Sequence, residues 1–521
     1  MLDAKKVILT LADNTTNTIT DSSRLSTEED YSAVIYSKED LIINGNGTLN
    51  VNAGYRNGIK STDDCIIVSG TLNITSTEDG IIGKDLCGIV AGDININAGS
   101  DGIKSTYDTD TTKGNVIIEG GNITIKASND GMQAENILVI NDGTINIKTN
   151  NGAADTTQTH IDNMDMGRGG FGFNNNKTTT TTDDTSESRK GIKAGNMLII
   201  NDGDITIDSD DDSVHCNSEI YIYGGTINAA TGDDGVHADD LLTVNGGTIN
   251  ITQCYEGLEA DDIVINDGDI SVVSSDDGIN SSDGSITING GNLLINASGD
   301  GLDANGSIII NGGYIVVLGP TSDGDTAIDY DDSCTINGGT VMAFGSSGML
   351  EIPKGASNGA CIVTAFTSVS GGSKYTLSDS NGNEILSYTP SKAYAAAIVY
   401  SDKITTGNTY NITAGSTTLS IEVTSDVTSN VSSGFGGAGG MNKPGNGGSG
   451  MPNNGSSDNG MNGNSNGSMP DMSGNGAPDM NGNSSGDMPS MGGNSSNNSG
   501  NMPNMNNGSS NVNAPQMNNR M

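Results

Sequence analysis

The sequence predicts an all-β protein, a right-handed parallel β-helix with coils of about 22 residues. The first observation is a glycine that returns every 21 to 23 residues, except where residues are inserted. Self-similarity at a fixed period of this length is typical of a solenoid, in which each repeat forms one coil. The column contains Gly58, Gly80, Gly102, Gly131, Gly152, Gly191, Gly235, Gly257, Gly278 and Gly301, with Ser213 in the slot after Gly191 and Ala327 in a weaker last copy.

A second column of turn residues keeps the same register. Most of its members precede Gly-Gly or Asp-Gly, which favour tight turns. We expect stacked Asn side chains to hydrogen-bond from coil to coil as a ladder. The column contains Asn201, Tyr223, Asn245, Asn266, Asn289, Asn311 and Asn337.

Alternating residues on both sides of the Asn-Gly-Gly turn indicate strands. In the repeat at 242–251, Leu242, Val244, Ile249 and Ile251 are expected to point inward, and glycine supplies the positive-φ corners. Each coil should therefore hold three short strands. A leucine-rich repeat is disfavoured because its spaced leucines and helical segment are absent, and a propeller blade needs about 40 residues.

The periodicity divides the chain into three parts. We expect the β-helix over residues 1–350, interrupted by a loop at 153–190. Ordinary strand patterns at 351–430 predict a small C-terminal β segment that caps the open end of the helix. Residues 431–521 are mostly Gly, Asn, Ser, Met and Pro, and this composition predicts disorder.

Composition limits the partners. The chain has 521 residues, a net charge of −42 and a pI near 4.1. A nucleic-acid partner is excluded because phosphate contacts need a basic patch. Membrane insertion is not expected either, since no apolar stretch approaches the roughly 18 residues of a membrane helix. The oligomeric state stays open, with a monomer as the expectation.

The N-terminus bears on localisation. A strand pattern begins at Lys6 with no polar cap before it, and an uncapped repeat array exposes a strand edge. We therefore expect the given start to be internal to a longer, exported protein. The predicted location is extracellular or at the cell surface, with the signal peptide missing from this chain.

Acidic residues recur in step with the repeat. From Ala194 to Pro353 there are 28 acidic residues and no lysine or arginine. Coils about 4.8 Å apart would stack these carboxylates, and this spacing equals twice a calcium–oxygen distance of roughly 2.4 Å. Hard oxygen ligands favour calcium over zinc. The predicted calcium ligands are Asp212, Asp233, Asp234, Asp239, Asp240, Glu256, Asp261, Asp262, Asp276, Asp277, Asp300 and Asp332. The alternative is that Asp-Gly only makes good turns, which explains the doubled Asp poorly.

The position two residues after each column glycine should face solvent, because the residue between them is apolar and points inward. This column is predicted to be the polysaccharide-binding strip: Lys193, His215, His237, Glu259, Asn280, Asp303 and Asp329. One polar group per coil suits a long linear polymer. The aromatic content of 4% leaves hydrogen bonding as the main contact. An ordinary solvated strand face remains the alternative, and the neighbouring His215 and His237 could be a surface pair or a metal site.

Catalysis has little support in the sequence. Calcium-dependent elimination from a uronate needs a Lys or Arg base, and the acid-rich half has only Lys193 at its boundary, with Lys60 and Lys104 in the same column in distant coils. Inverting glycoside hydrolysis needs two carboxylates about 6.5–9.5 Å apart. This surface would offer many such pairs, so the signal is unspecific.

Four motifs together carry a resemblance to a known family. They are the segment at 33–45, Asp-Gly-Ile-Lys-Ser at 101–105, Asp-Gly-Val-His-Ala at 234–238 and Tyr-Glu-Gly-Leu-Glu at 255–259. The chain resembles a bacterial family of secreted carbohydrate-binding β-helix proteins over roughly residues 5–425. The resemblance implies a pectate-lyase-like fold, bound calcium, and binding of cellulose and pectic polygalacturonate without cleavage. Members of that family carry a Gly-rich insertion at the place of 153–190, and further N-terminal coils.

These observations together predict an extracellular, calcium-dependent, non-catalytic polysaccharide-binding protein. A calcium-dependent pectate lyase and a structural surface protein or adhesin are the two alternatives.

Overall fold

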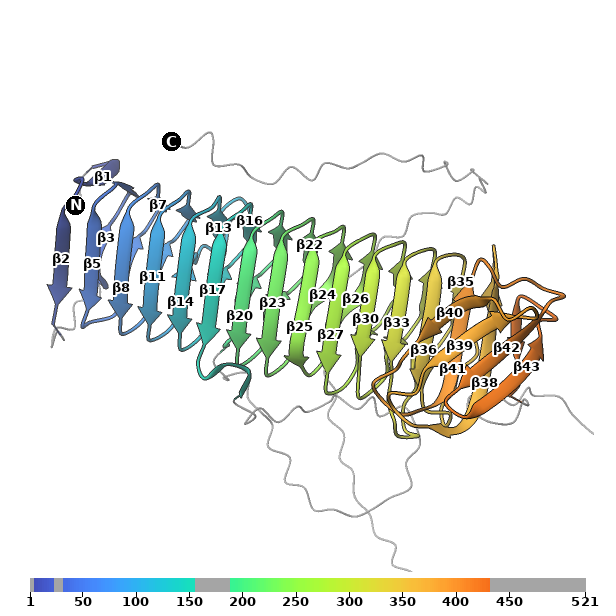
Figure 1. The fold of residues 1–521 in the computed structure, drawn as a ribbon. Helices are drawn as coiled ribbons and strands as arrows, with labels where there is room; N and C mark the ends of the chain where they lie inside the picture. The colour runs from blue at the N-terminus through green and yellow to red at the C-terminus, as the bar shows by residue number, and fades with distance from the viewer. Residues whose placement is uncertain (1–3, 23–30, 155–187, 432–521) are drawn as a thin grey trace, which may run out of the picture. The chain divides into compact units, whose positions relative to one another are not determined.

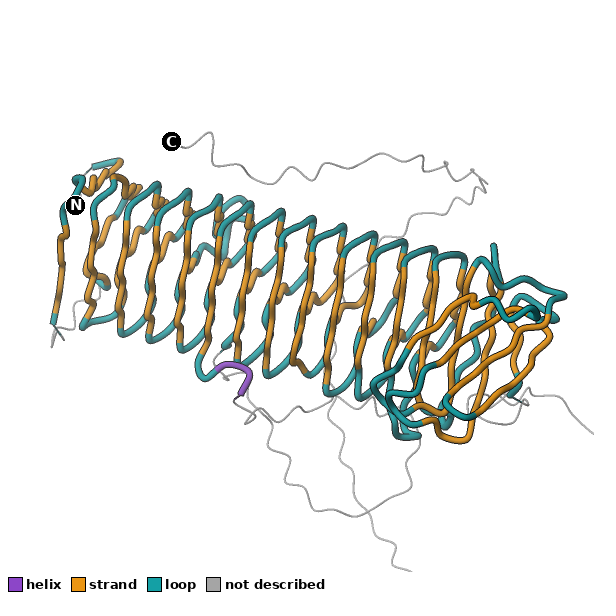
Figure 2. Tube along the Cα trace, viewed as in Figure 1, coloured by secondary structure: helices purple, strands orange, loops and turns teal. Residues whose placement is uncertain are grey.

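The computed structural model describes residues 4–22, 31–154 and 188–431, all of which belong to one of the chain's two compact units. The predicted disordered tail, apart from its first residue, and most of the predicted loop at 153–190 lie outside these residues. The described chain is almost entirely β-strand, with one short 3-10 helix, η1 (Gly152–Ala154) (Figure 2). No helix in this part of the chain is long and apolar enough to cross a membrane.

Parallel strands stack into three ladders, with about one strand per coil in each, which confirms the predicted β-helix (Figure 1). The first ladder contains β3 (Ala33–Ser37), β6 (Asn57–Ser61), β9 (Ile81–Gly83), β12 (Ile103–Lys104), β15 (Met132–Ala134), β18 (Ile192–Ala194), β21 (Val214–Cys216), the first part of β24 (Val236–Val244), the first part of β26 (Leu258–Ile265), β28 (Ile279–Ser281), β31 (Leu302–Ala304) and β34 (Ile328–Tyr330). The second ladder contains β1 (Lys6–Leu11), β4 (Asp40–Gly45), β7 (Asp64–Ile67), β10 (Leu86–Ile89), β13 (Asn115–Ile118), β16 (Ile137–Ile140), β19 (Met197–Ile200), β22 (Glu219–Ile222), the second parts of β24 and β26, β29 (Ile286–Ile288), β32 (Ser307–Ile310), β35 (Ser333–Ile336) and β37 (Gly355–Ala356). The third ladder contains β2 (Thr16–Asp21), β5 (Thr48–Ala53), β8 (Thr71–Ser76), β11 (Asp93–Ala98), β14 (Asn122–Ala127), β17 (Thr144–Thr149), β20 (Asp204–Ser209), β23 (Thr226–Thr231), β25 (Thr248–Cys254), β27 (Asp269–Ser274), β30 (Asn292–Asn296), β33 (Tyr314–Leu318) and β36 (Thr340–Gly345).

Inward-pointing aliphatic side chains from all three ladders form one continuous core. Leu242, Val244, Ile249 and Ile251 are each at most 1% exposed, as their alternation predicts. Burial of one such side chain contributes roughly 1.5–3 kcal/mol, and every coil adds several. Stacking of coils is therefore the main source of stability.

The repeating glycines have two different roles. Gly257 belongs to the predicted column, and a Cβ atom there would lie 2.2 Å from the carbonyl oxygen of Gly278 in the next coil. A side chain would push the coils apart. Gly247, in the turn after Asn245, instead has a φ of +92°, a conformation that L-residues with a side chain rarely adopt.

One member of the predicted glycine column is wrong. Gly191, not Gly152, follows Gly131 in the stack, because Met132 pairs with Ile192 in the first ladder. Gly152 lies in η1 with a φ of +74°. A glycine about one period after Gly131 therefore matched the repeat by spacing alone.

The predicted Asn ladder is confirmed from Asn245 onward. The side-chain amide of Asn266 donates to Asn245 Oδ1 at 2.9 Å, and Asn289 donates to Asn266 at 2.8 Å. Asn311 and Asn337 continue the ladder at 2.8 and 3.0 Å. These bonds link one coil to the next, so the Asn column has a structural role.

In the third ladder, parallel stacking ends at β36. This strand pairs antiparallel with β41 (Tyr394–Ser401), which pairs antiparallel with β38 (Ala360–Val369), and β38 pairs with β44 (Val427–Ser429). A four-stranded sheet follows the order β40 (Glu384–Tyr388), β39 (Tyr375–Asp379), β42 (Thr409–Ala414) and β43 (Thr417–Glu422). Buried side chains of the last coils, such as Phe344, pack against Tyr375 and Tyr394 of this C-terminal part.

Candidate functional site

The predicted polysaccharide-binding strip is a continuous row in the first ladder. Parallel pairing puts its seven residues opposite one another in successive coils, in the order Lys193, His215, His237, Glu259, Asn280, Asp303 and Asp329. All are half-buried except His215, which is 8% exposed. The row therefore offers one polar side chain per coil, at steps of about 4.8 Å.

The strip extends toward the N-terminus and changes charge on the way. The register continues upstream through Tyr36, Lys60, Ile82, Lys104 and Gln133. Lysines thus occupy every second coil up to Lys193, two histidines follow, and the remaining charged residues are acidic. Sequence reasoning had placed Lys60 and Lys104 in this row and had missed the positions between them.

Beside the strip lies a carboxylate ladder, formed by the acidic residues that precede Gly80, Gly102, Gly131, Ser213, Gly235, Gly257, Gly278 and Gly301. The Oδ1 atom of Asp79 accepts the backbone N–H of Asp101 at 3.1 Å, and Asp101 accepts that of Asp130 at 3.0 Å. Asp212 and Asp234 each accept the backbone N–H of the next coil in the same way, at 3.1 and 3.0 Å. The predicted metal ligands of this column therefore also hold the coils together.

This hydrogen bond needs an acceptor but no negative charge. At the N-terminal end of the ladder, Asn57 Oδ1 accepts the backbone N–H of Asp79 at 3.0 Å. An amide therefore supports the ladder, and the acidic residues of the later coils require a separate explanation.

The first coil of the acid-rich half has a counter-charge that the sequence analysis did not expect. The Lys190 ammonium lies 2.9 Å from Asp211 Oδ1 and 2.5 Å from Asp212 Oδ2. Burial alone would raise the pKa of Asp212, but Lys190 holds it well below its usual range. Arg189 likewise pairs with Asp210 at 2.8 Å. The end of the predicted loop therefore supplies the missing cations at this point.

Further along, Asp277, Asp300 and Asp303 form a group with no such counter-charge. One carboxylate oxygen from each lies within 4.8 Å of the others. None of the ion pairs formed within the described residues involves any of the three. Burial and neighbouring acids raise the pKa of Asp277 to about 8 and that of Asp303 to about 6. Burial raises the pKa of Asp300 to about 9, although a hydrogen bond from Thr326 opposes this.

Other predicted calcium ligands fall into two sets. Asp233 groups with Asp211 and Asp212, and Asp234 groups with His237 and Glu259, within the same 4.8 Å limit. Within the described residues, no group of this kind contains Asp239, Asp240, Glu256, Asp261, Asp262, Asp276 or Asp332.

Most of this second set is exposed or bonded locally. Glu256 accepts a hydrogen bond from Asn280 at 2.9 Å, and Asp262 accepts the backbone N–H of Ser285 at 2.9 Å. Asp239, Asp240, Asp262 and Asp332 are exposed. Asp239 and Asp240 lie in β24 and Asp262 lies in β26, where each strand passes from the first ladder to the second.

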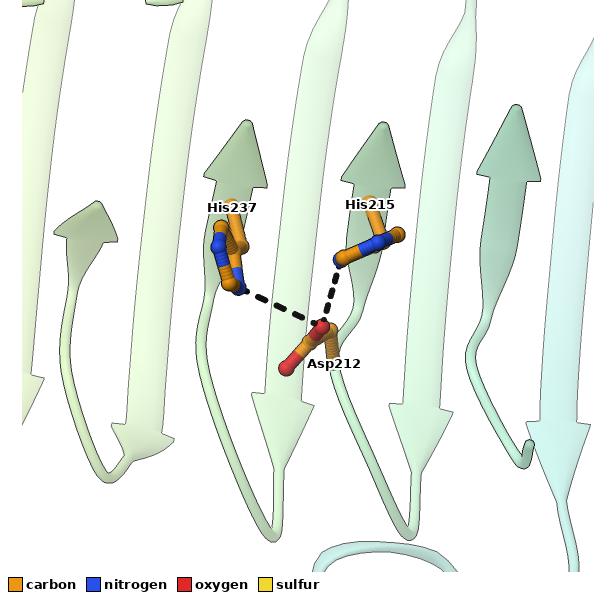
Figure 3. A group of neighbouring side chains, drawn as sticks. All are labelled: Asp212, His215 and His237. Atoms are coloured by element: carbon orange, nitrogen blue, oxygen red, sulfur yellow. Dashed lines mark ion pairs between the residues drawn. The ribbon is translucent and has the colours of Figure 1, made fainter. Parts of the chain in front are cut away.

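The rings of the two histidines of the strip meet edge to face beside Asp212 (Figure 3). Their ring centres are 4.9 Å apart and the planes cross at 81°. Burial alone would lower the pKa of His237, but Asp234, Asp212 and Glu259 raise it overall to about 10. Positive charge is therefore favoured at this point of the strip.

Comparison with known proteins agrees with this arrangement. A family model described as "Carbohydrate-binding domain-containing protein" matches residues 1–235 and 233–419. A protein of Acetivibrio thermocellus with the same description is 39% identical over 75 residues, which is 14% of this chain and 26% of the relative. The match thus spans about a quarter of the relative's length. No solved structure matches the chain. Because the family model covers most of the sequence, this chain belongs to the family of carbohydrate-binding domain-containing proteins.

Proposed function

We propose that this protein binds a polysaccharide of the cellulose or pectic polygalacturonate class outside the cell, in a calcium-dependent manner and without cleaving it. The observation that carries the proposal is the group of Asp277, Asp300 and Asp303. These carboxylates have neither ammonium nor guanidinium partners among the described residues, and one of them belongs to the strip.

The strip supports a linear ligand. It offers hydrogen-bonding side chains at steps of about 4.8 Å along a straight row, and no deep enclosed site is needed. Such a row suits an extended chain of sugars, in which similar hydroxyl groups recur at a similar spacing.

Calcium explains why the ladder is acidic. Two carboxylates 4.8 Å apart repel by about 3 kcal/mol at an effective dielectric near 20, and Asn57 satisfies the same backbone hydrogen bond without this repulsion. A calcium ion coordinated by oxygens at roughly 2.4 Å turns the repulsion into attraction. It would also bridge protein carboxylates to the carboxylates of a uronate polymer, which a chain of charge −42 would otherwise repel.

Retention on solid polysaccharide tests the proposal. The full chain is applied to cellulose and to covalently cross-linked polygalacturonate, with calcium or with EDTA. We expect retention with calcium and loss with EDTA, and we expect the double variant Asp277→Asn/Asp303→Asn to behave with calcium as the native protein does with EDTA.

Asp269→Asn is the matched control, because Asp269 is an exposed carboxylate on the third ladder, outside the strip. Equal retention in EDTA would contradict calcium dependence. No retention on either matrix would leave a structural surface role, with calcium serving rigidity.

Lys60 favours a second candidate, a calcium-dependent lyase. It lies in the strip, and burial lowers its pKa although Asp79 opposes this, so it is a candidate base for proton abstraction. Incubation with several pectins and calcium at neutral to alkaline pH decides the matter. New absorbance from unsaturated uronides that Lys60→Ala abolishes would establish a lyase, and its absence would remove this candidate.

A further inference from the structure

Two imidazoles in the middle of the strip face one carboxylate oxygen. His215 Nδ1 lies 2.9 Å from Asp212 Oδ2, and His237 Nδ1 lies 3.7 Å from the same oxygen (Figure 3). The two rings come from successive coils and Asp212 from the turn before the first of them. Parallel stacking therefore brings the three side chains to one point.

The protonation of His215 makes this contact unusual. Its Nε2 lies 2.9 Å from the Oδ1 atom of Asn217, which accepts hydrogen bonds, so Nε2 carries the proton in the neutral ring. Its buried Nδ1 lies close to Asp212 Oδ2 but makes no hydrogen bond of acceptable geometry. A nitrogen lone pair that faces a carboxylate oxygen at 2.9 Å repels it unless a proton or a metal ion lies between them.

Further carboxylate oxygens lie around the His237 ring. Its Nδ1 lies 3.3 Å from Glu259 Oε2 and 3.5 Å from Asp234 Oδ2. Its other ring nitrogen, Nε2, lies 3.6 Å from Asp239 Oδ1. A metal on Nδ1 would thus have carboxylates beside it, while Asp239 would hold the far side of the ring, as second-shell carboxylates do for metal-bound histidines.

The charged group that competes for this point is Lys190. Its ammonium lies 2.5 Å from Asp212 Oδ2 and 2.9 Å from Asp211 Oδ1. A carboxylate oxygen has two lone pairs, so Asp212 Oδ2 can accept from Lys190 on one and coordinate a cation on the other. Lys190 would then orient the carboxylate and reduce the net negative charge of the site.

We propose that Asp212, His215 and His237, which form one group within the 4.8 Å limit, are a binding site for a divalent metal ion of the zinc class, with Glu259 beside His237. Zinc lies about 2.0–2.2 Å from its nitrogen and oxygen ligands, which form a tetrahedron. At these bond lengths the ligand atoms are about 3.4 Å apart. Asp212 Oδ2 lies 2.9 Å from His215 Nδ1 and 3.7 Å from His237 Nδ1, on either side of this value. Imidazole nitrogen selects zinc, nickel or copper over calcium.

The site differs in chemistry from the calcium group, whose ligands are all oxygens and which lies further along the ladder at Asp277, Asp300 and Asp303. Zinc binding in solution needs no glycan. The zinc proposal and the proposed polysaccharide binding can therefore fail independently.

Zinc titration of the full chain, without an affinity tag and stripped with EDTA, tests the assignment. Affinity is measured by competition with a chromogenic zinc chelator, and cobalt(II) replaces zinc for a visible spectrum. We expect His237→Gln to weaken zinc binding by at least about tenfold, and His215→Gln/His237→Gln to abolish this site together with the visible bands of four-coordinate cobalt.

His160→Gln is the matched control, because His160 is the third histidine of the chain and lies outside the described residues. It should leave zinc affinity unchanged. Should the double variant fail to fold by circular dichroism, His237→Gln alone decides, since His237 is only half-buried. Wild-type zinc affinity in His237→Gln, or displacement of zinc by an equal concentration of calcium, would overturn the assignment.

Discussion

Replacing Asp277 by Asn should stabilise the calcium-free protein. The amide oxygen keeps the hydrogen bond that Asp277 Oδ1 accepts from the backbone N–H of Asp300 at 2.5 Å. The change removes one of the three carboxylates that lie within 4.8 Å of one another. At an effective dielectric near 20, two charges at that distance repel by about 3 kcal/mol. We therefore expect a gain of about 3 kcal/mol in the free energy of unfolding at pH 8 in EDTA.

The gain should depend on pH with a definite sign. The folded-state pKa of Asp277, about 8, lies above the ordinary value of 3.8, so the folded protein holds a proton that the unfolded chain has released. Stability of the native protein then falls as the pH rises from about 4 to about 8. The advantage of Asp277→Asn should shrink toward pH 4 and vanish below it, where the carboxyl is protonated in both states.

Calcium should reverse the order of the two proteins. Calcium at 100 times its dissociation constant stabilises the native folded state by about 2.7 kcal/mol. Asp277→Asn replaces a charged carboxylate that coordinates calcium by a neutral amide, so the variant should gain less. Urea unfolding followed by far-ultraviolet circular dichroism, in EDTA and in calcium, measures both effects, with Asp269→Asn as control. A variant that is less stable than the native protein in EDTA at pH 8, or that responds to calcium as the native protein does, would refute the reasoning.

Three further predictions concern the ladder, the glycines and the C-terminal end of the strip. Asp101→Ala should lower the free energy of unfolding in urea by about 1–3 kcal/mol more than Asp101→Asn, because only Ala leaves the next coil's amide without an acceptor. Equal losses would contradict a stabilising role for the hydrogen bonds of the carboxylate ladder. Gly257→Ala should lower the thermal midpoint, since its Cβ would lie 2.2 Å from backbone, whereas Gly324→Ala, with nothing within 4 Å, should not. Burial and then Asp329 raise the pKa of Glu351 to about 7, so stability should fall between about pH 4.5 and 7 by about 1 kcal/mol or less per pH unit, and a pH series on Glu351→Gln should lack this slope.

The repeat period made much of this fold predictable. Because parallel coils put the same position of each repeat at the same place, counting from one glycine to the next located the strip, including His215 opposite His237 and Asn280 opposite Asp303. The inward face followed from alternation, as at Leu242. Both the register of the strip and the inward face of the strands follow from the spacing of residues along the sequence.

Contacts that depend on the path of the backbone were not predictable in this way. Gly152 matches the period but lies in η1, and the strand that pairs with Met132 in the next coil begins at Ile192. The ion pair between Lys190 and Asp212 depends on where that strand begins. The backbone hydrogen bonds of the carboxylate ladder require the height and twist of successive turns, which no periodicity specifies.

The acidic columns also divided in a way that spacing could not give. Carboxylates that precede the column glycines, such as Asp212 and Asp234, are buried against the next coil. Those after the first-ladder strands, such as Asp240 and Asp262, are exposed. Equal spacing therefore produced one packed column and one solvated set.

The most direct test of the account is an anomalous difference map from a crystal soaked in calcium. The account predicts a peak coordinated by oxygens of Asp277, Asp300 and Asp303, with ligand distances of about 2.3–2.6 Å. The absence of a peak at saturating calcium, with these three carboxylates ordered, would contradict the claim that stacked carboxylates of this coil hold a divalent cation.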